Sequence, residues 1–245
     1  MVMMNLTWFI KQAITVAFLG RLGELQLAGG ALGFTFANVT GYSILTGLCG
    51  AMEPICGQAY GAKNYRLLHR TLFMVTLLLL VATLPISILW LNISKILPLF
   101  GQQEDMVVMA HRYLLYLLPD LMVNAFLCPL KTYLSAQGIT VPIMLSSTLA
   151  VVFHVPINIL LIKTKGFEGV AIAVWISDLL IMLLLALYVL HMELRGREKW
   201  QERGVVGSGY QGMACLAQLM RAMLPDNLLR VVVLRDPSPP HRETS

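Results

Sequence analysis

The chain has 245 residues, of which 57% are apolar and 13% are charged, and its mean hydropathy is +0.72. This balance lies outside the usual range for soluble domains and predicts that lipid surrounds most of the chain. The net charge of +5 is spread over the ends of expected helices, with no basic patch bearing interleaved aromatic residues. We therefore expect no nucleic-acid partner. The expected partner is a lipid bilayer.

Six apolar segments predict six membrane-spanning helices. A helix needs about 20 mostly apolar residues to cross a bilayer, and short connections separate such segments over the first 192 positions. We place the helices at 1–20, 27–52, 71–91, 107–131, 141–162 and 169–190. A closed barrel would show short alternating strands instead of runs such as Leu77–Val81. The sequence predicts an all-α, multi-pass membrane protein with a six-helix bundle at 1–192.

Basic residues in the connections predict the orientation of this bundle. One side receives eight of them, and the other receives four, which are Arg21, Lys95, Lys163 and Lys165. The eight are Lys63, Arg66, Arg70, Lys131, Arg195, Arg197, Lys199 and Arg203. Since basic residues are enriched in cytoplasmic loops, we expect the N-terminus and the end of the sixth helix in the cytosol. The plasma membrane and the vacuolar or other endomembranes remain alternatives.

The last part of the chain, 193–245, differs in character from the bundle. It starts as a charged segment that we expect to be a cytosolic linker, and it ends in the proline-rich sequence Asp236–Ser245. Such a composition is typical of disorder. The valine runs at 205–206 and 231–233 also suggest a frame shift, because a one-base shift of repeated TGG tryptophan codons gives GTG valine codons. We expect the tail after Arg203 to be disordered or frame-shifted.

Three stretches of the first third of the chain carry a family resemblance. The first is Gly20 to Gly30 (GRLGELQLAGG), the second is Gly41 to Gly47 (GYSILTG), and the third is Glu53 to Lys63 (EPICGQAYGAK). We expect the third stretch to be a polar turn that closes the second helix. Together the three resemble the first two helices of plant-type multidrug and toxic compound extrusion transporters.

The resemblance implies a twelve-helix transporter built as two six-helix bundles, of which this chain holds the first. It implies an efflux antiporter that exchanges protons for small organic, often cationic, solutes, with a proton gradient as driving force and no cofactor. Bacterial members of the family carry an aspartate where this chain has Thr15, so a cation site of that type is in doubt here. In plant-type members the proton-coupling acids lie mainly in the second bundle. Two alternatives are a non-transporting fragment that modulates a full-length relative, and a membrane receptor or enzyme.

The third stretch supplies the candidate transport motif. Glu53 is either a proton-responsive or gating carboxylate or an interfacial acid paired with Lys63 or Arg66. A carboxylate at a membrane helix end is costly unless it is hydrated, paired or neutral. The glycines have the spacing that permits close helix packing or a tight turn. The motif residues are Glu53, Pro54, Gly57, Gln58, Tyr60 and Gly61.

Polar residues inside the apolar segments are candidates for lining a cavity, with ordinary hydrogen bonds between helices as the alternative. Asp178 is a functional candidate because a charge within a membrane helix must face the bundle or a water-filled space. Pro119 kinks its helix beside Asp120, which suits a cavity wall or simple kinked packing. The candidates are Asn5, Thr15, Asn38, Pro119, Asp120, Asn124, Asn158 and Asp178.

Catalytic and metal sites are not expected. His154 is a lone histidine with no second ligand at metal spacing, and no nucleophile, phosphate-loop or zinc-protease motif is present in the sequence. A membrane enzyme is therefore the weaker alternative, and the transporter that the resemblance implies is the expectation.

Overall fold

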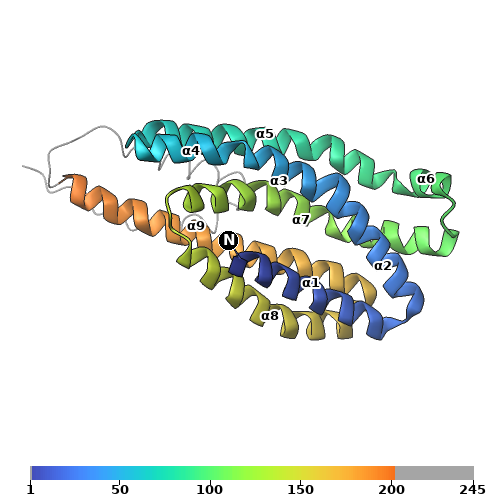
Figure 1. The fold of residues 1–245 in the computed structure, drawn as a ribbon. Helices are drawn as coiled ribbons and strands as arrows, with labels where there is room; N and C mark the ends of the chain where they lie inside the picture. Colours follow the sequence, from blue (N-terminus) through green and yellow to red (C-terminus); the bar gives the residue numbers. More distant parts are fainter. Residues whose placement is uncertain (1, 202–245) are drawn as a thin grey trace, which may run out of the picture.

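The computed structural model describes the backbone of residues 2–201 and the side chains of 6–98 and 101–192. Its described residues form long helical rods that run roughly along one another (Figure 1). The first rod is α1 (Val2–Leu22). A turn at Gly23, whose φ of 134° favours glycine, leads into the second rod. The predicted all-α fold is confirmed.

The second rod is a run of four helical pieces. They are α2 (Glu24–Ala37), the π-helical turn η1 (Asn38–Tyr42), α3 (Ser43–Gly50) and α4 (Met52–Gly61). The break before α4 has a local cause, because Pro54 has no N–H to donate to the carbonyl of Gly50 but is tolerated in the first turn of a helix. The predicted turn at Glu53 to Lys63 was therefore wrong. This stretch is helical to Gly61, and the chain reverses at 62–64, where Lys63 adopts a φ of 55°.

The remaining rods follow with short connections. Asn64 caps α5 (Tyr65–Leu91), since its side chain accepts a hydrogen bond of 3.2 Å from the N–H of Leu67. Two short pieces, α6 (Ile93–Ile96) and η2 (Leu97–Phe100), lead to α7 (Glu104–Ala136).

The last two rods are α8 (Val141–Lys165) and α9 (Phe167–Gln201). The helix therefore continues through 193–201, where a linker was expected. The residues from 202 onward, with the predicted disordered or frame-shifted tail, lie outside the described residues.

Four helices among the described residues are long and apolar enough to cross a membrane, namely Tyr65–Leu91, Glu104–Ala136, Val141–Lys165 and Phe167–Met192. The first two rods do not meet that criterion, since the pieces of the second rod have at most 14 residues each. The predicted count of six is only partly confirmed. Exposed apolar side chains recur at helical spacing along α5, from Leu77 through Val81 and Leu84 to Ile88, as expected for a helix facing lipid.

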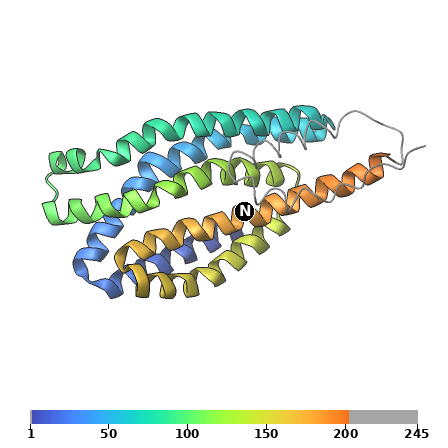
Figure 2. The ribbon, with the colours of Figure 1, turned by 180° about the vertical axis from the view of Figure 1, so that it is seen from behind.

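Helix α7 lies at the centre of the bundle, between α2 and α5 on one side and α9 on the other (Figures 1 and 2). Helices α2 and α7 approach each other closely at two glycines of α2. A Cβ on Gly33 would lie 3.0 Å from the carbonyl oxygen of Ala110, and one on Gly29 would overlap the Cβ of Met109. The rods α2 and α7 thus pack backbone to backbone.

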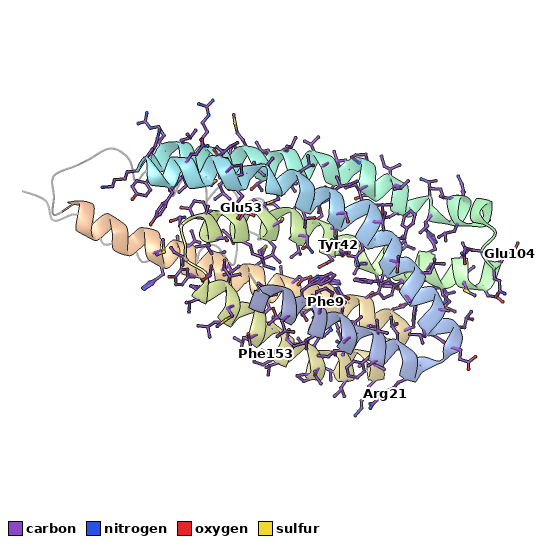
Figure 3. All side chains as sticks on the ribbon, in the orientation of Figure 1. Phe9, Arg21, Tyr42, Glu53, Glu104 and Phe153 are labelled. Atoms are coloured by element: carbon purple, nitrogen blue, oxygen red, sulfur yellow. The ribbon has the colours of Figure 1, made fainter. Side chains whose placement is uncertain are left out.

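The connections lie alternately at the two ends of the bundle. Arg21 and Glu104 lie at one end (Figure 3), together with the α8–α9 connection, and the reversal at 62–64 lies at the other (Figure 1). The assignment of Lys131 to a connection between helices was wrong. Lys131 belongs to no connection, because it lies inside α7 and lines a cavity. The basic asymmetry is therefore weaker than expected, while its direction is unchanged.

Candidate functional site

A cavity of about 360 Å³ opens between α1, the second rod, α7 and α9. Its apolar lining includes Phe34 and Leu127, but charged and polar side chains from four rods also converge on it. A few polar groups on a largely apolar wall are typical of small-molecule sites. The polar and charged lining residues are Lys11, Gln12, Asn38, Tyr42, Ser43, Thr46, Asp120, Asn124, Lys131 and Asp178.

Lys11 and Asp178, which both line this cavity, form an ion pair at its edge. The distance from Nζ to Oδ1 is 2.7 Å, and the two side chains are 6% and 15% exposed. The same ammonium donates a hydrogen bond of 3.2 Å to the carbonyl oxygen of Val174 on α9. Within 6–98 and 101–192 it is the one ion pair closer than 4.0 Å. A charge on α1 is thus held against α9.

Asp120 is the most deeply buried acid of the cavity, at 1% exposure. Its Oδ2 accepts hydrogen bonds from the Tyr42 hydroxyl and from Nδ2 of Asn124, the latter at 3.0 Å. Its Oδ1 is buried and has no hydrogen-bond partner among the described residues. The nearest donors to this carboxyl group are therefore neutral, in contrast to those of Asp178.

The π-helical turn η1 carries Tyr42, which Figure 3 labels, and the hydroxyl of Tyr42 donates a hydrogen bond to Asp120. A Cβ on Gly41 would lie 2.6 Å from Cζ2 of Trp90, so only glycine allows the turn to approach the indole this closely. Nε1 of Trp90 donates a 3.0 Å hydrogen bond to the hydroxyl of Thr40, which anchors η1 to α5. Single π-helical turns within α-helices are frequent at functional sites.

Behind the cavity wall, a chain of polar contacts joins α1, α8 and α9. His154 is fully buried, and its ring nitrogens lie 3.1 Å from the hydroxyl of Thr15 and 2.7 Å from that of Ser177. Each hydroxyl also lies within hydrogen-bonding distance of a carbonyl oxygen one turn earlier on its own helix. The histidine, for which no metal was expected, thus has two hydrogen-bonding partners here.

The structure brings only some of the predicted cavity residues together. Asn38, Asp120, Asn124 and Asp178 line the cavity. Thr15 and Asn158 are buried elsewhere in hydrogen-bonded positions, and Pro119 is exposed on the outer side of α7. Asn5 belongs to α1, but its side chain lies outside the described residues.

The predicted transport motif lies on α4, away from the residues that line this cavity. Glu53, Pro54, Gly57, Gln58, Tyr60 and Gly61 are all exposed, and Glu53 forms no ion pair with Lys63 or Arg66 among the described residues. A Cβ on Gly57 or Gly61 would meet nothing within 4 Å. These glycines therefore make no close helix contact within the described part of this bundle.

Six of the polar and charged lining residues were missed as candidates, namely Lys11, Gln12, Tyr42, Ser43, Thr46 and Lys131. Lys11 lies within the predicted first helix, Lys131 was assigned to a connection, and Tyr42 belongs to one of the stretches that carry the resemblance. A signal existed for Lys11 and Lys131, because each charge interrupts an apolar run and must find a polar environment.

Comparison with known proteins identifies related chains. The MatE family model matches residues 1–160. Protein DETOXIFICATION 56 of Arabidopsis thaliana is 56% identical over 219 residues, which cover 89% of this chain and 45% of that protein. Protein DETOXIFICATION 48 of the same plant is 47% identical over 189 residues, covering 76% of this chain and 36% of the relative. The chain thus spans less than half the length of these relatives.

Solved structures resemble the bundle as well. The crystal structure of the eukaryotic MATE transporter AtDTX14 matches with a TM-score of 0.75 at 31% identity, over 89% of this chain and 48% of that chain. An outward-facing multidrug resistance MATE family transporter of the MOP superfamily matches with a TM-score of 0.67 at 20% identity, over 76% and 42%, which shows the shared fold. The solved relatives are transporters.

Proposed function

Because the chain belongs to the MatE family and is an integral, multi-pass membrane protein, we propose that it forms one wall of the pathway of an organic-solute efflux antiporter. The observation that carries the proposal is the polar cavity between α1, the second rod, α7 and α9. A charged cavity within an otherwise apolar bundle is costly to maintain, and intramembrane ionisable residues commonly mark substrate or ion paths.

The proposed mechanism is alternating access. Two bundles rock against each other around a shared site near the middle of the membrane, and this chain corresponds to one bundle, because it covers 45% of its 56%-identical relative. We propose that protons drive the cycle and that the substrate is a small amphipathic, often cationic, organic molecule. The carboxyl groups of Asp120 and Asp178 suit a cationic group, since both face the cavity.

The motif on α4 has a separate proposed role. Its exposed glycines and Glu53 leave one face of α4 without close contacts from the described part of this bundle, so a second bundle can lie against it. We propose that Glu53 acts at that boundary during rocking, and that the orientation places the reversal at 62–64 in the cytosol.

The experiment is proton-driven efflux by a two-bundle version of the protein in liposomes. Glu53→Gln removes the charge and preserves size and hydrogen-bonding capacity, so the rate should fall by more than the protein level. Glu104→Gln, at the exposed start of α7, is the matched control and should not change efflux. Failure of the parent protein to move any organic cation against a proton gradient would contradict the proposed function. An unchanged rate in Glu53→Gln would reduce Glu53 to an anchor at the membrane interface.

A second candidate is a regulatory fragment that associates with a full-length relative. The open face of α4 favours it, because the same surface could pair with another bundle. Reconstitution of the full-length relative with and without this chain separates the two roles. A change in the relative's efflux rate together with no transport by a two-bundle version would favour regulation.

A further inference from the structure

Three basic side chains lie at the end of the bundle where the chain reverses from α4 into α5. They are Lys63 in the reversal and Arg66 and Arg70 in the first two turns of α5, and all three are exposed. Arg66 and Arg70 are four residues apart, so they share one face of the helix. Like charges at this spacing destabilise a helix, and an anion bound between them would remove that repulsion.

No acidic side chain balances these charges within the part of the chain whose side chains are described. The one ion pair closer than 4.0 Å there lies at the cavity, on other helices. Between Glu53 and Glu104, which Figure 3 labels, the sequence contains no acid. Glu53 precedes Lys63 by ten positions, which corresponds to about 15 Å along a helix, and Glu104 lies at the opposite end of the bundle. The three cations are therefore available to an anion from outside the chain.

The two arginines continue the face of α5 that is expected to contact lipid. Exposed apolar side chains follow Arg70 at helical spacing, and they are Met74, Leu77, Val81, Leu84 and Ile88. From Arg70 to Leu91, the last residue of α5, the helix rises about 30 Å, which is the thickness of the hydrocarbon core of a bilayer. Arg70 therefore lies at the boundary between acyl chains and headgroups. A lipid whose acyl chains lie along this face presents its phosphate at the level of Arg70.

Two tyrosines mark the same boundary. The rings of Tyr60 on α4 and Tyr65 on α5 meet edge to face, with their centroids 6.4 Å apart. Tyrosine is enriched at the headgroup level of membranes, where its ring and its hydroxyl meet different surroundings. Arg66 lies about one turn, and Lys63 about two turns, farther from the acyl chains than Arg70. The three cations thus lie at successive depths of the headgroup region.

We propose that Lys63, Arg66 and Arg70 bind the headgroup of a phosphatidylinositol monophosphate. The phosphodiester group that joins the headgroup to the acyl chains lies against Arg70. The second phosphate, on the inositol ring, carries a charge of about −1.5 to −2 as a monoester and reaches the depth of Arg66 and Lys63. Guanidinium groups bind phosphate oxygens through paired hydrogen bonds. This site goes beyond the proposed function, because the ligand is a membrane lipid at the outer surface of the bundle and not a transported solute.

The test counts bound lipids by native mass spectrometry of the purified 245-residue chain in detergent. Phosphatidylinositol 4-phosphate, phosphatidylserine and phosphatidylcholine with identical acyl chains are added one at a time, and we expect the first to bind most tightly. Arg66→Gln/Arg70→Gln should weaken its binding by about fivefold for each charge removed. Lys163→Gln/Lys165→Gln removes two exposed charges at the opposite end of the bundle and is the matched control, which should keep the affinity of the parent chain.

Three results would overturn the proposal. Equally tight binding of phosphatidylserine would show a general attraction to anionic lipids, and unchanged binding in Arg66→Gln/Arg70→Gln would place the headgroup elsewhere. Displacement of the lipid by an equal concentration of inositol 1,4-bisphosphate, which has both phosphates and no acyl chains, would show that the ligand is a soluble phosphate. If the double variant does not fold, as judged by circular dichroism, Lys63→Gln decides with an expected loss of about fivefold. The readout needs no transport, so it stands or fails separately from the efflux experiment.

Discussion

Lys11 on α1 and Asp178 on α9 are held together by a 2.7 Å ion pair at the edge of the cavity, although they lie in the first and the last described helices. Neither residue can be removed alone without leaving the other charge in an apolar bundle. Breaking a buried pair by removing one partner costs about 3–5 kcal/mol, and replacing both with apolar groups is often close to neutral.

We therefore expect Lys11→Met and Asp178→Asn each to lower the free energy of unfolding by up to about 3 kcal/mol, since the pair is only partly screened from the cavity. The double variant should recover part of the loss, which a double-mutant cycle in mixed detergent micelles measures. Lys163→Met, at the exposed end of α8, serves as control. Additive losses in the double variant would show that the two charges do not interact.

The glycines of the second rod predict opposite effects of the same substitution. A Cβ on Gly41 would lie 2.6 Å from Trp90, and a Cβ on Gly57 would meet nothing within 4 Å. Gly41→Ala should lower the free energy of unfolding by about 1–3 kcal/mol, because the indole must move. Gly57→Ala should be neutral or raise it by up to about 1 kcal/mol, because alanine favours the helix. Equal effects, measured by unfolding of the chain alone, would contradict the close approach at η1.

The contacts of the buried His154 predict that removing two different hydroxyl groups will have different effects on stability. Ser177→Ala removes a partner 2.7 Å from the His154 ring and leaves a buried polar atom without it, which costs about 1–3 kcal/mol. Thr148→Ala removes an exposed hydroxyl that bonds only its own helix, so it should have almost no effect. Thermal unfolding followed by circular dichroism measures both. An unchanged unfolding temperature in Ser177→Ala would show that the polar contacts between α8 and α9 contribute little to stability.

Much of the helical framework was predictable, because apolar length is a local property of the sequence. The predicted segment 71–91 became α5 and 141–162 became α8, each extended at an end. Those extensions follow from caps and turns that carry little apolar signal, such as Asn64 before α5. The glycines of α4 were read as a turn, although its backbone hydrogen bonds continue to Gly61. The reversal depends instead on the backbone of Lys63.

The candidate site was only half predictable. Asp120 and Asp178 stood out as acids within apolar runs. The partners that define them come from other helices, and no local pattern in the sequence specifies such long-range pairs. Tyr42 reaches Asp120 because a π-helical turn rotates it there, and Lys11 meets Asp178 because α1 packs near α9.

The orientation of the bundle has a direct test. A single cysteine in place of Asn64, in a version with the native cysteines replaced, should be labelled only from the cytosolic side. The reason is that the basic residues at this end of the bundle, counted with those at the end of α9, outnumber those at the other end. A cysteine in place of Lys165, at the opposite end of the bundle, should be labelled only from the other side. Labelling of the Asn64 position only from the extracytoplasmic side would reverse the proposed orientation.

The chain expressed alone should insert into membranes without moving substrate. Alternating access needs a second bundle that rocks against the first around a shared site, and the described helices of this chain supply one wall. Purified chain in liposomes, with an imposed proton gradient and a fluorescent organic cation, provides the measurement. We expect no gradient-dependent movement, whereas a two-bundle version prepared in parallel should transport and lose activity with a proton ionophore.

Pairing of two copies is the strongest alternative to this expectation. The open face of α4, with Gly57 and Gly61, could let one copy stand in for the missing bundle. Transport by the chain alone, abolished by the ionophore, would show that such pairing completes the pathway. Replacing both glycines with leucine would then separate the two explanations, because it fills the open face without a clash inside the bundle. If two copies pair, this variant should lose transport and elute as a monomer. If a single bundle is self-sufficient, the variant should keep transport and its elution should not change.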